Sequence, residues 1–338
     1  MPLTKAKALA SWSRSNTAGL LILTAATWVV CASFGEGFLT SFNLFSVSQL
    51  TAEFAIIGLA QMVVLATGRM NLAIGAVGVC VGMLTGWLMG VVGWPPAAAI
   101  VVGLLAGVLS GALMAALELA TGLSSFIVTI AMGSVFSGGM LLLTQGESVN
   151  YLPRSVVQFG AQTLGTAYIS AHVIPTLILT VALWFIFRHT TFGWSMLAVG
   201  ANQAAARLSG IRTGWVVVGA MSLSGLLAGV AANLEISRVA AAVPSMGTTW
   251  MMTSFIIPVL GGTALTGGRV SVAGALLAAL FIETITTGLI SLGVPSYWLG
   301  AVQAMVLLLA VLGDKARRDR QLRGQSDRAP GSKEAVDV

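Results

Sequence analysis

The stretch WPPAAAIVVGLLAGVLSGALMAAL, residues 94–117, carries no charged side chain. A helix of this length extends about 36 Å at 1.5 Å per residue, enough to cross the roughly 30 Å hydrocarbon core of a bilayer. Three of its glycines, Gly103, Gly107 and Gly111, recur every four residues. This spacing lets helix backbones approach closely inside a membrane. The stretch therefore predicts a membrane-spanning helix that packs tightly against others.

Similar apolar runs recur along most of the chain, which has 338 residues, 57% hydrophobic and 8% charged. This balance lies outside the range of soluble domains. We therefore predict an all-α polytopic membrane protein with a transmembrane domain over residues 17–313. Its ten spans are 17–35, 44–66, 71–90, 94–117, 122–143, 166–187, 215–234, 250–262, 268–288 and 295–313. The third and eighth have Gly-rich, polar flanks, which leaves partial re-entry open for both.

The positions of Lys and Arg predict that both termini face the cytoplasm. With ten spans and the N-terminus inside, 15 of the 17 basic residues are cytoplasmic, and Arg154 and Arg238 lie outside. This asymmetry follows the positive-inside rule. Residues 1–16 then form a cytoplasmic N-terminal segment, 189–214 a cytoplasmic loop and 314–338 a disordered cytoplasmic tail. The net charge of +6 fits an inner face in contact with anionic lipid, and we expect no nucleic-acid partner.

Ionisable side chains at membrane depth are the first candidates for a functional site, because each costs several kcal/mol unless it is paired or hydrated. Glu53 lies in the second span, and its spacing from Gln49 and Gln61 puts the three on roughly one helical face. Glu283 lies in the ninth span. Either residue could line a hydrated path or make a structural hydrogen bond to a neighbouring helix, and the sequence leaves both interpretations open.

The sequence contains no recognisable catalytic or metal-binding arrangement. His172 and His189 lie far apart without carboxylate neighbours, and the two cysteines fall within apolar spans. The stretch GGTALTGGR, residues 261–269, lacks the Lys-Ser/Thr pair of a phosphate-binding loop. We therefore expect neither an enzyme nor a cofactor or metal in this chain.

Three stretches together resemble the permeases of ABC importers for ribose, xylose, arabinose and related sugars, the branched binding-protein-dependent permease family. They are GLAQMVVLATGRMNLAIGAV (58–77), AVGANQAAARLSGIRTG (198–214) and VLGGTALTGGRVSVAGALLAAL (259–280). The resemblance implies a fold like that of the vitamin B12-type importers and a location in the bacterial plasma (inner) membrane. It also implies three partners: an extracytoplasmic sugar-binding protein, a second permease copy or sister permease, and a cytoplasmic ATPase whose two nucleotide-binding domains hold ATP and magnesium.

The resemblance identifies residues 199–212 as the coupling element, a short cytoplasmic helix that docks on the ATPase. The alanines favour a helix, and Gly210 suits a left-handed position that ends it. Arg207 and Arg212 can pair with acidic groups of a partner. The alternative is a solvated loop kept basic for topology. The predicted coupling residues are Asn202, Ala206, Arg207, Gly210, Ile211 and Arg212.

Two further groups of residues are assigned less directly. The predicted substrate path consists of Glu53, Gln61, Asn71 and Glu283, and the predicted docking surface for the binding protein consists of Arg154, Arg238, Glu147 and Glu235. The chain also departs from its family, which usually has Gly-Gly-Ile-Asp-Leu-Ser where this sequence has GRMNLA (68–73). Near 287, Thr stands where the family often has Asn.

The leading hypothesis is the pore-forming subunit of an ATP-driven importer for a monosaccharide or related polyol. An ion-coupled secondary transporter of a small polar solute is the alternative, and an intramembrane enzyme is disfavoured by the missing catalytic groups. The sequence leaves open which sugar is carried and whether the permease pairs with itself.

Overall fold

The computed structural model describes residues 3–165, 168–306, 308–309 and 312. The described part of the chain is helical, apart from loops and two isolated β-bridges. Its elements are α1 (Leu3–Phe34), α2 (Ser41–Ala66), α3 (Ile74–Gly90), α4 (Pro96–Thr121), α5 (Ser125–Thr144), α6 (Arg154–Ala161), α7 (Val173–His189), α8 (Thr191–Ala201), α9 (Gln203–Leu208), α10 (Thr213–Val239), α11 (Trp250–Leu260), α12 (Val272–Ser291) and a short 3₁₀ turn, η1 (Ser296–Trp298).

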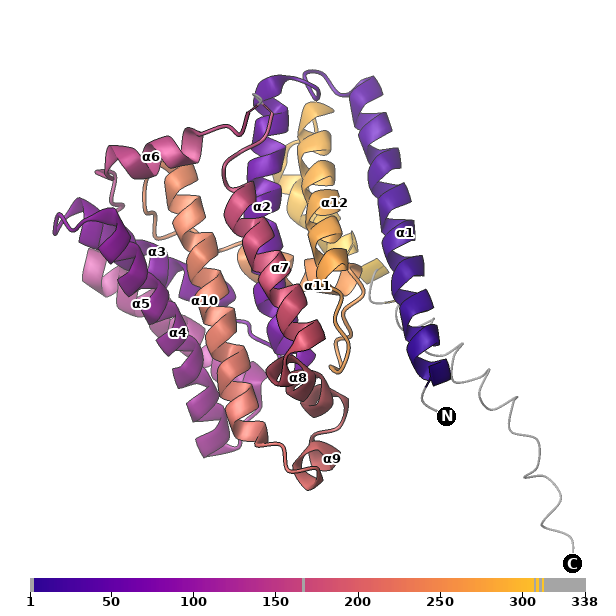
Figure 1. Ribbon diagram of the computed structural model, residues 1–338. Helices are drawn as coiled ribbons and strands as arrows, with labels where there is room; N and C mark the ends of the chain where they lie inside the picture. The colour runs from indigo at the N-terminus through magenta and orange to yellow at the C-terminus, as the bar shows by residue number, and fades with distance from the viewer. Residues whose placement is uncertain (1–2, 166–167, 307, 310–311, 313–338) are drawn as a thin grey trace, which may run out of the picture.

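The helices form one bundle in which α6 lies at one end and α9 at the other (Figure 1). We call these the α6 end and the α9 end. Five described helices are long and apolar enough to cross a membrane, or six if the bent pair α7 and α8 is one span. The structure therefore confirms an all-α polytopic membrane protein.

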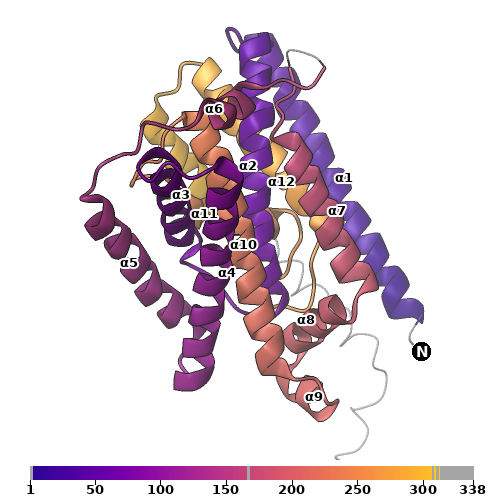
Figure 2. The same ribbon diagram turned by 60° about the vertical axis from the view of Figure 1, so that its left-hand side comes forward.

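Helix α2 forms the core of the bundle. In its most apolar 18-residue window 89% of residues are buried, against 22% for α5, which lies at the edge far from α1 (Figure 2). Helices α10, α11 and α12 all pack against α2. Hydropathy alone does not separate inner from outer helices, because an apolar side chain can face lipid as well as protein. The buried fraction does separate them: α2 is an inner helix that can carry internal sites, and α5 is a peripheral one.

The glycine repeat of residues 103–111 packs α4 against α10. A Cβ atom at Gly107 would collide with the carbonyl oxygen of Gly225, and one at Gly111 with that of Met221. The two backbones are therefore in direct contact, which is possible only without a side chain at these positions. The close helix packing predicted from this spacing is confirmed.

Helices α3 and α11 are short. α11 has 11 residues and contains Pro258, so it extends only about 16 Å, roughly half the hydrocarbon thickness. The loop before α3 is anchored by Asn71, whose amide group donates to Ser224 Oγ at 3.2 Å. Ser224 lies near the middle of α10, so this loop enters the interior of the bundle.

The element boundaries differ from the sequence prediction in several places, among them α7, which begins at Val173 and not at 166. α1 begins at Leu3, so most of the predicted N-terminal segment 1–16 continues that helix. α10 runs to Val239 instead of ending at 234, and the amphipathic α6 was not predicted. The predicted span 295–313 contains helical residues 299–306 and 308–309, and the predicted tail 314–338 lies outside the described residues.

Candidate functional site

Two glycine-containing turns, one after α2 and one between α11 and α12, meet the last turn of α8 at the α9 end. We call Gly68, Gly200, Gly267 and Gly268 the glycine junction. The Gly268 N–H donates to the Ala66 carbonyl at 3.1 Å. A Cβ at Gly200 would collide with that same carbonyl oxygen, and one at Gly267 would lie 2.6 Å from Gly68 N. Since these contacts are between backbones, α8 is fixed directly to the end of α2 and to the loop between α11 and α12.

The glycine junction joins the three stretches that carry the family resemblance, although they are far apart in the sequence. Gly68, Gly267 and Gly268 have φ values of 74°, 88° and 76°, the left-handed region in which residues with a Cβ are strained. Glycine is therefore favoured at these positions for two reasons: the backbone conformation strains other residues, and there is no space for a side chain. A movement of α8 would be transmitted to α2, α11 and α12 without an intervening flexible side chain.

The predicted coupling element consists of two helices and not one. Asn202 is extended, with φ −162° and ψ 104°, and its side chain accepts a hydrogen bond from the Ala205 N–H at 3.0 Å. The residue thus ends α8 and caps α9, which is why the single helix expected over 199–212 is wrong. Gly210 follows α9 with φ 81°, so its predicted left-handed conformation is confirmed.

The segment from α8 to α10 presents an exposed tip beyond the bundle. Leu208 is 91% exposed, and Arg212 is exposed beside the half-buried Ile211. Ala206 is buried, and Arg207 Nε donates to Thr213 Oγ1 at 3.1 Å, which ties α9 to the start of α10. The tip is therefore anchored at its base and offers an apolar side chain flanked by positive charge.

A second candidate site is an ion pair between α2 and α10. Arg238 Nε lies 3.1 Å from Glu53 Oε2, and Arg238 also lies 3.7 Å from Glu235. The Glu53 side chain is 1% exposed and that of Arg238 27%. The sequence prediction ended the seventh span at 234 and placed Arg238 in the outer loop that follows. The loop position is wrong, because α10 continues to Val239 and directs the Arg238 guanidinium onto Glu53. The side of the membrane on which Arg238 lies stays a prediction.

Two more buried polar groups lie in this region of the bundle. Glu283 is 1% exposed and lies on α12, which packs against α2. Within the described part of the chain, Glu283 Oε2 and both amide atoms of Gln61 lack a hydrogen-bond partner. A buried polar atom without a partner costs free energy, so these atoms are candidates for contact with a solute or with water.

The predicted substrate-path residues are thus only partly brought together. Glu53 and Glu283 lie on the packed helices α2 and α12, and Gln61 lies two turns further along α2 towards the α9 end. Asn71 is separate, because its amide bonds Ser224 and its Oδ1 accepts from the Ala73 N–H at 3.0 Å. Its contacts shape the turn before α3. The role of the four as a path remains a prediction.

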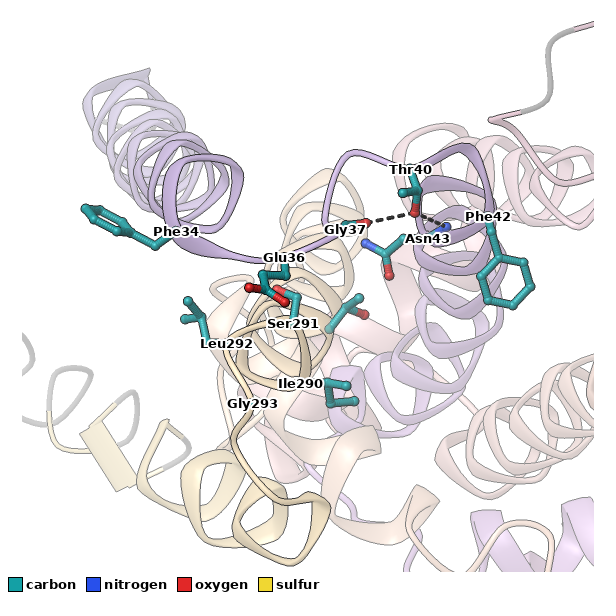
Figure 3. Close-up of a pocket in the computed structure, with 11 residues that line it drawn as sticks. Phe34, Glu36, Gly37, Thr40, Phe42, Asn43, Ile290, Ser291, Leu292 and Gly293 are labelled. Carbon is teal, nitrogen blue, oxygen red and sulfur yellow. Dashed lines mark hydrogen bonds between the residues drawn. The ribbon is translucent and has the colours of Figure 1, made fainter.

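The α6 end also contains a cavity of about 660 Å³ between the α1–α2 loop and the end of α12 (Figure 3). Glu36, Thr40 and Asn43 line it from one side, and Thr287 and Ser291 from the other. Glu283 lies one helical turn below Thr287 on α12. This cavity could not be predicted from the sequence, because its walls come from segments about 250 residues apart.

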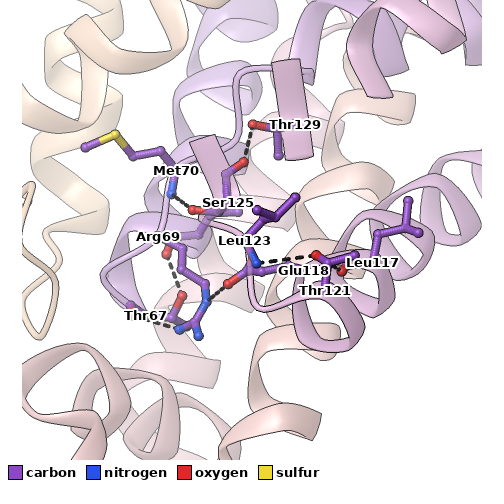
Figure 4. Close-up of polar contacts among 10 residues, drawn as sticks. Thr67, Arg69, Met70, Leu117, Glu118, Thr121, Leu123, Ser125 and Thr129 are labelled. Atoms are coloured by element: carbon purple, nitrogen blue, oxygen red, sulfur yellow. Dashed lines mark hydrogen bonds and ion pairs between the residues drawn. The ribbon is translucent and has the colours of Figure 1, made fainter. Parts of the chain in front are cut away.

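The unusual Arg69 has a partner that the sequence did not indicate. Its guanidinium forms an ion pair with Glu118 in the last turn of α4 (Figure 4), and both side chains are mostly buried. The adjacent Met70 N–H is held by Ser125 Oγ at 3.3 Å. The cation that distinguishes this chain from the family pattern therefore joins the α2–α3 turn to α4.

The remaining predicted docking residues are at the α6 end. Arg154 begins α6 and is exposed, as is Glu147 in the preceding loop. Glu235 is mostly buried beside Arg238. Arg154 and Glu147 therefore remain accessible to a partner, and docking stays a prediction for all four residues.

The fold and these sites together define a class: a helical membrane protein with buried polar groups along its core helices. Within the described residues no group of His, Cys, Asp and Glu is arranged to hold a metal ion.

The model of one known protein family matches most of this chain. Residues 43–311 match the family described as branched-chain amino acid transport system / permease component, and the chain belongs to this family.

Individual relatives cover nearly the same length. The ribose import permease of Bacillus subtilis is 33% identical over 302 residues, which are 88% of this chain and 91% of the relative. The ribose import permease of Escherichia coli strain K12 is 32% identical, over 88% of this chain and 92% of its own. The D-allose transport system permease of the same strain is 30% identical, over 85% and 89%.

Membership settles the class of activity. The chain is the permease component of a transport system in the bacterial inner membrane, and it is not itself an enzyme. The family description mentions branched-chain amino acids, whereas the relatives above are named for sugars.

Proposed function

We propose that this chain forms the pore of an ATP-driven ABC importer that moves a monosaccharide or related polyol into the cytoplasm. The observation that carries the proposal is the similarity to ribose import permeases over 88% of the chain. The glycine junction supports it, because it links the exposed α8–α9 tip to the helices that hold the buried polar groups. Two permease copies, or this chain and a sister permease, would enclose the path.

The proposed route begins at the cavity at the α6 end. Its hydroxyl, amide and carboxylate groups are the kind that hydrogen-bond a sugar. From there a sugar would pass Glu53 and Glu283 and then the unpartnered amide of Gln61. Sparse hydrogen bonding along such a route favours weak binding and easy release. ATP and magnesium would be held by the partner ATPase and not by this chain.

Partners would dock at opposite ends. The α8–α9 tip, with Leu208 and Arg212, suits a cleft of the cytoplasmic ATPase that carries two nucleotide-binding domains. The α6 end, with Arg154 and Glu147 exposed, suits the extracytoplasmic sugar-binding protein. Co-purification of the permease with that ATPase, followed by ATP hydrolysis stimulated by the loaded binding protein, tests this assignment. A permease that neither binds the ATPase nor supports stimulated hydrolysis would refute it.

Ten spans with both termini in the cytoplasm fit this arrangement. We expect a cysteine at Ser155, next to Arg154, and one at Ser209, two residues after Arg207, to react with a membrane-impermeant reagent from opposite sides. Both positions are exposed, at opposite ends of the bundle. The background should carry Cys31→Ala and Cys80→Ala, because these are the two native cysteines. Labelling of Ser155→Cys only from outside and Ser209→Cys only from inside supports the orientation, and labelling of both from outside contradicts it.

The alternative, an ion-coupled secondary transporter, would use the same buried acids. Glu53 and Glu235 share one ion-pair partner, Arg238, and Glu283 on α12 is a third buried carboxyl group. This excess of carboxylates is the one observation in its favour, and dependence of uptake on ATP or on an ion gradient separates the two.

A further inference from the structure

A cavity of about 660 Å³ lies at the α9 end, outside both the glycine junction and the buried ion pair. Its walls are the last turns of α7, the side of α8 and the first residues of α12. They consist of Trp184, Phe187, Arg188, His189, Trp194, Leu197, Val270, Ser271, Val272 and Ala273. We call it the α7–α12 pocket. Its size is within the usual range for ligand sites, about 300–1,000 Å³.

The charged groups of the α7–α12 pocket are all basic. Arg188 and His189 are the last two residues of α7, and both side chains are exposed. Among the described residues, no ion pair or hydrogen bond engages the Arg188 guanidinium, while the Trp194 indole donates to the Arg188 carbonyl at 3.3 Å. No Asp or Glu lines the cavity. The pocket therefore favours an anion, and a guanidinium is well suited to a phosphate because it can donate two parallel hydrogen bonds.

The remaining walls are apolar and aromatic. Trp184 and Trp194 are 49% and 65% exposed, and the His189 ring lies 5.5 Å from the Trp184 ring, edge to face. Tryptophan concentrates where a membrane protein meets the headgroup region, and basic side chains near helix ends reach the same level. Phe187, Leu197 and Val272 add surface that a hydrated free phosphate would not need. The ligand that matches both halves is a phosphate attached to an acyl-bearing glycerol.

We propose that the α7–α12 pocket binds the phosphate headgroup of an anionic phospholipid, with Arg188 as its main ligand. A lipid held there would contact α7, α8 and α12 together, beside the glycine junction. The position thus makes the lipid a support for the base of the α8–α9 tip. Only one part of this proposal rests on the proposed function, namely that the lipid belongs to the cytoplasmic leaflet. That assignment holds if both termini are inside. This leaflet is the one whose basic flanks attract anionic lipids.

The test is a lipid titration of the purified permease in neutral detergent, with the thermal unfolding temperature as the measurement. We expect phosphatidylglycerol to raise this temperature for the wild type, whereas phosphatidylcholine and inorganic phosphate at equal concentration do not. Arg188→Gln should weaken the apparent affinity for phosphatidylglycerol by about tenfold or more, since a hydrogen bond to a charged group is lost. Arg188→Lys should retain part of the effect, which shows that the fold tolerates a change at this position.

The matched control is Arg212→Gln, which removes one positive charge from the same end of the bundle but does not line the pocket. It should titrate like the wild type. Equal weakening by both substitutions, an unchanged response in Arg188→Gln, or the same stabilisation by inorganic phosphate would each overturn the proposal. Because the readout is lipid binding and not transport, its failure is distinguishable from failure of the importer assignment.

Discussion

Replacement of Gly200 by alanine is expected to reduce uptake tenfold or more while the permease still inserts and folds. The added methyl group would collide with the Ala66 carbonyl oxygen and lie 2.5 Å from Gly268 N, so backbone must shift. Forcing a methyl group into a filled contact costs about 1–3 kcal/mol. Gly200 is the point where α8 contacts both α2 and the α11–α12 loop. We therefore expect the substitution to weaken the contact between the α8–α9 tip and the rest of the bundle.

Uptake and ATP hydrolysis should be measured side by side, in proteoliposomes with equal amounts of permease. Gly139→Ala is the matched control, since Gly139 is also helical but has no atom within 4 Å of its added Cβ. We expect hydrolysis to persist without matching uptake in Gly200→Ala, and wild-type values for both in the control. Wild-type uptake by Gly200→Ala would contradict a coupling role for the glycine junction.

The second large effect concerns the buried ion pair. Arg238→Ala should lower the free energy of unfolding by about 3–5 kcal/mol, because the carboxylate of Glu53, 1% exposed, would be left in the core without its cation. The double variant Glu53→Gln with Arg238→Gln should recover much of this loss, since it leaves no uncompensated charge. The measurement is the midpoint of denaturant unfolding in detergent, followed by tryptophan fluorescence.

Arg154→Ala controls for the loss of one positive charge at the same end, and its exposed side chain should make it nearly neutral. The double variant also separates stability from transport. If it is stable but inactive, the pair contributes to the path as well as to the fold. A loss in the double variant that equals the sum of the losses in the single variants Glu53→Gln and Arg238→Gln would show that Glu53 and Arg238 are not energetically coupled.

Most of the fold follows from the sequence because lipid imposes a simple length rule. Apolar runs of about 20 residues become helices, and glycines every four residues become helix contacts, as at Gly107 and Gly111. The amphipathic α6 escaped prediction because its eight residues are too short for that rule. The break at Asn202 also escaped, since Asn can sit within a helix or cap one and only the local backbone decides.

The candidate sites were less predictable because they are made by contacts remote in sequence. Glu53 and Glu283 stood out as charges at membrane depth, but the partner of Glu53 lies 185 residues away. The positive-inside rule counts Arg238 as a loop charge, since it treats a basic residue near a span end as exposed. Arg69 was noticeable only as a departure from a family pattern, and its pairing with Glu118 required the structure.

The most direct test of the importer assignment is uptake of labelled ribose or allose into proteoliposomes that contain this permease, its ATPase and its binding protein. We expect uptake of at least one of these sugars that requires both ATP and the binding protein and that continues when ion gradients are collapsed. Uptake that proceeds without the ATPase and follows an imposed ion gradient would contradict it.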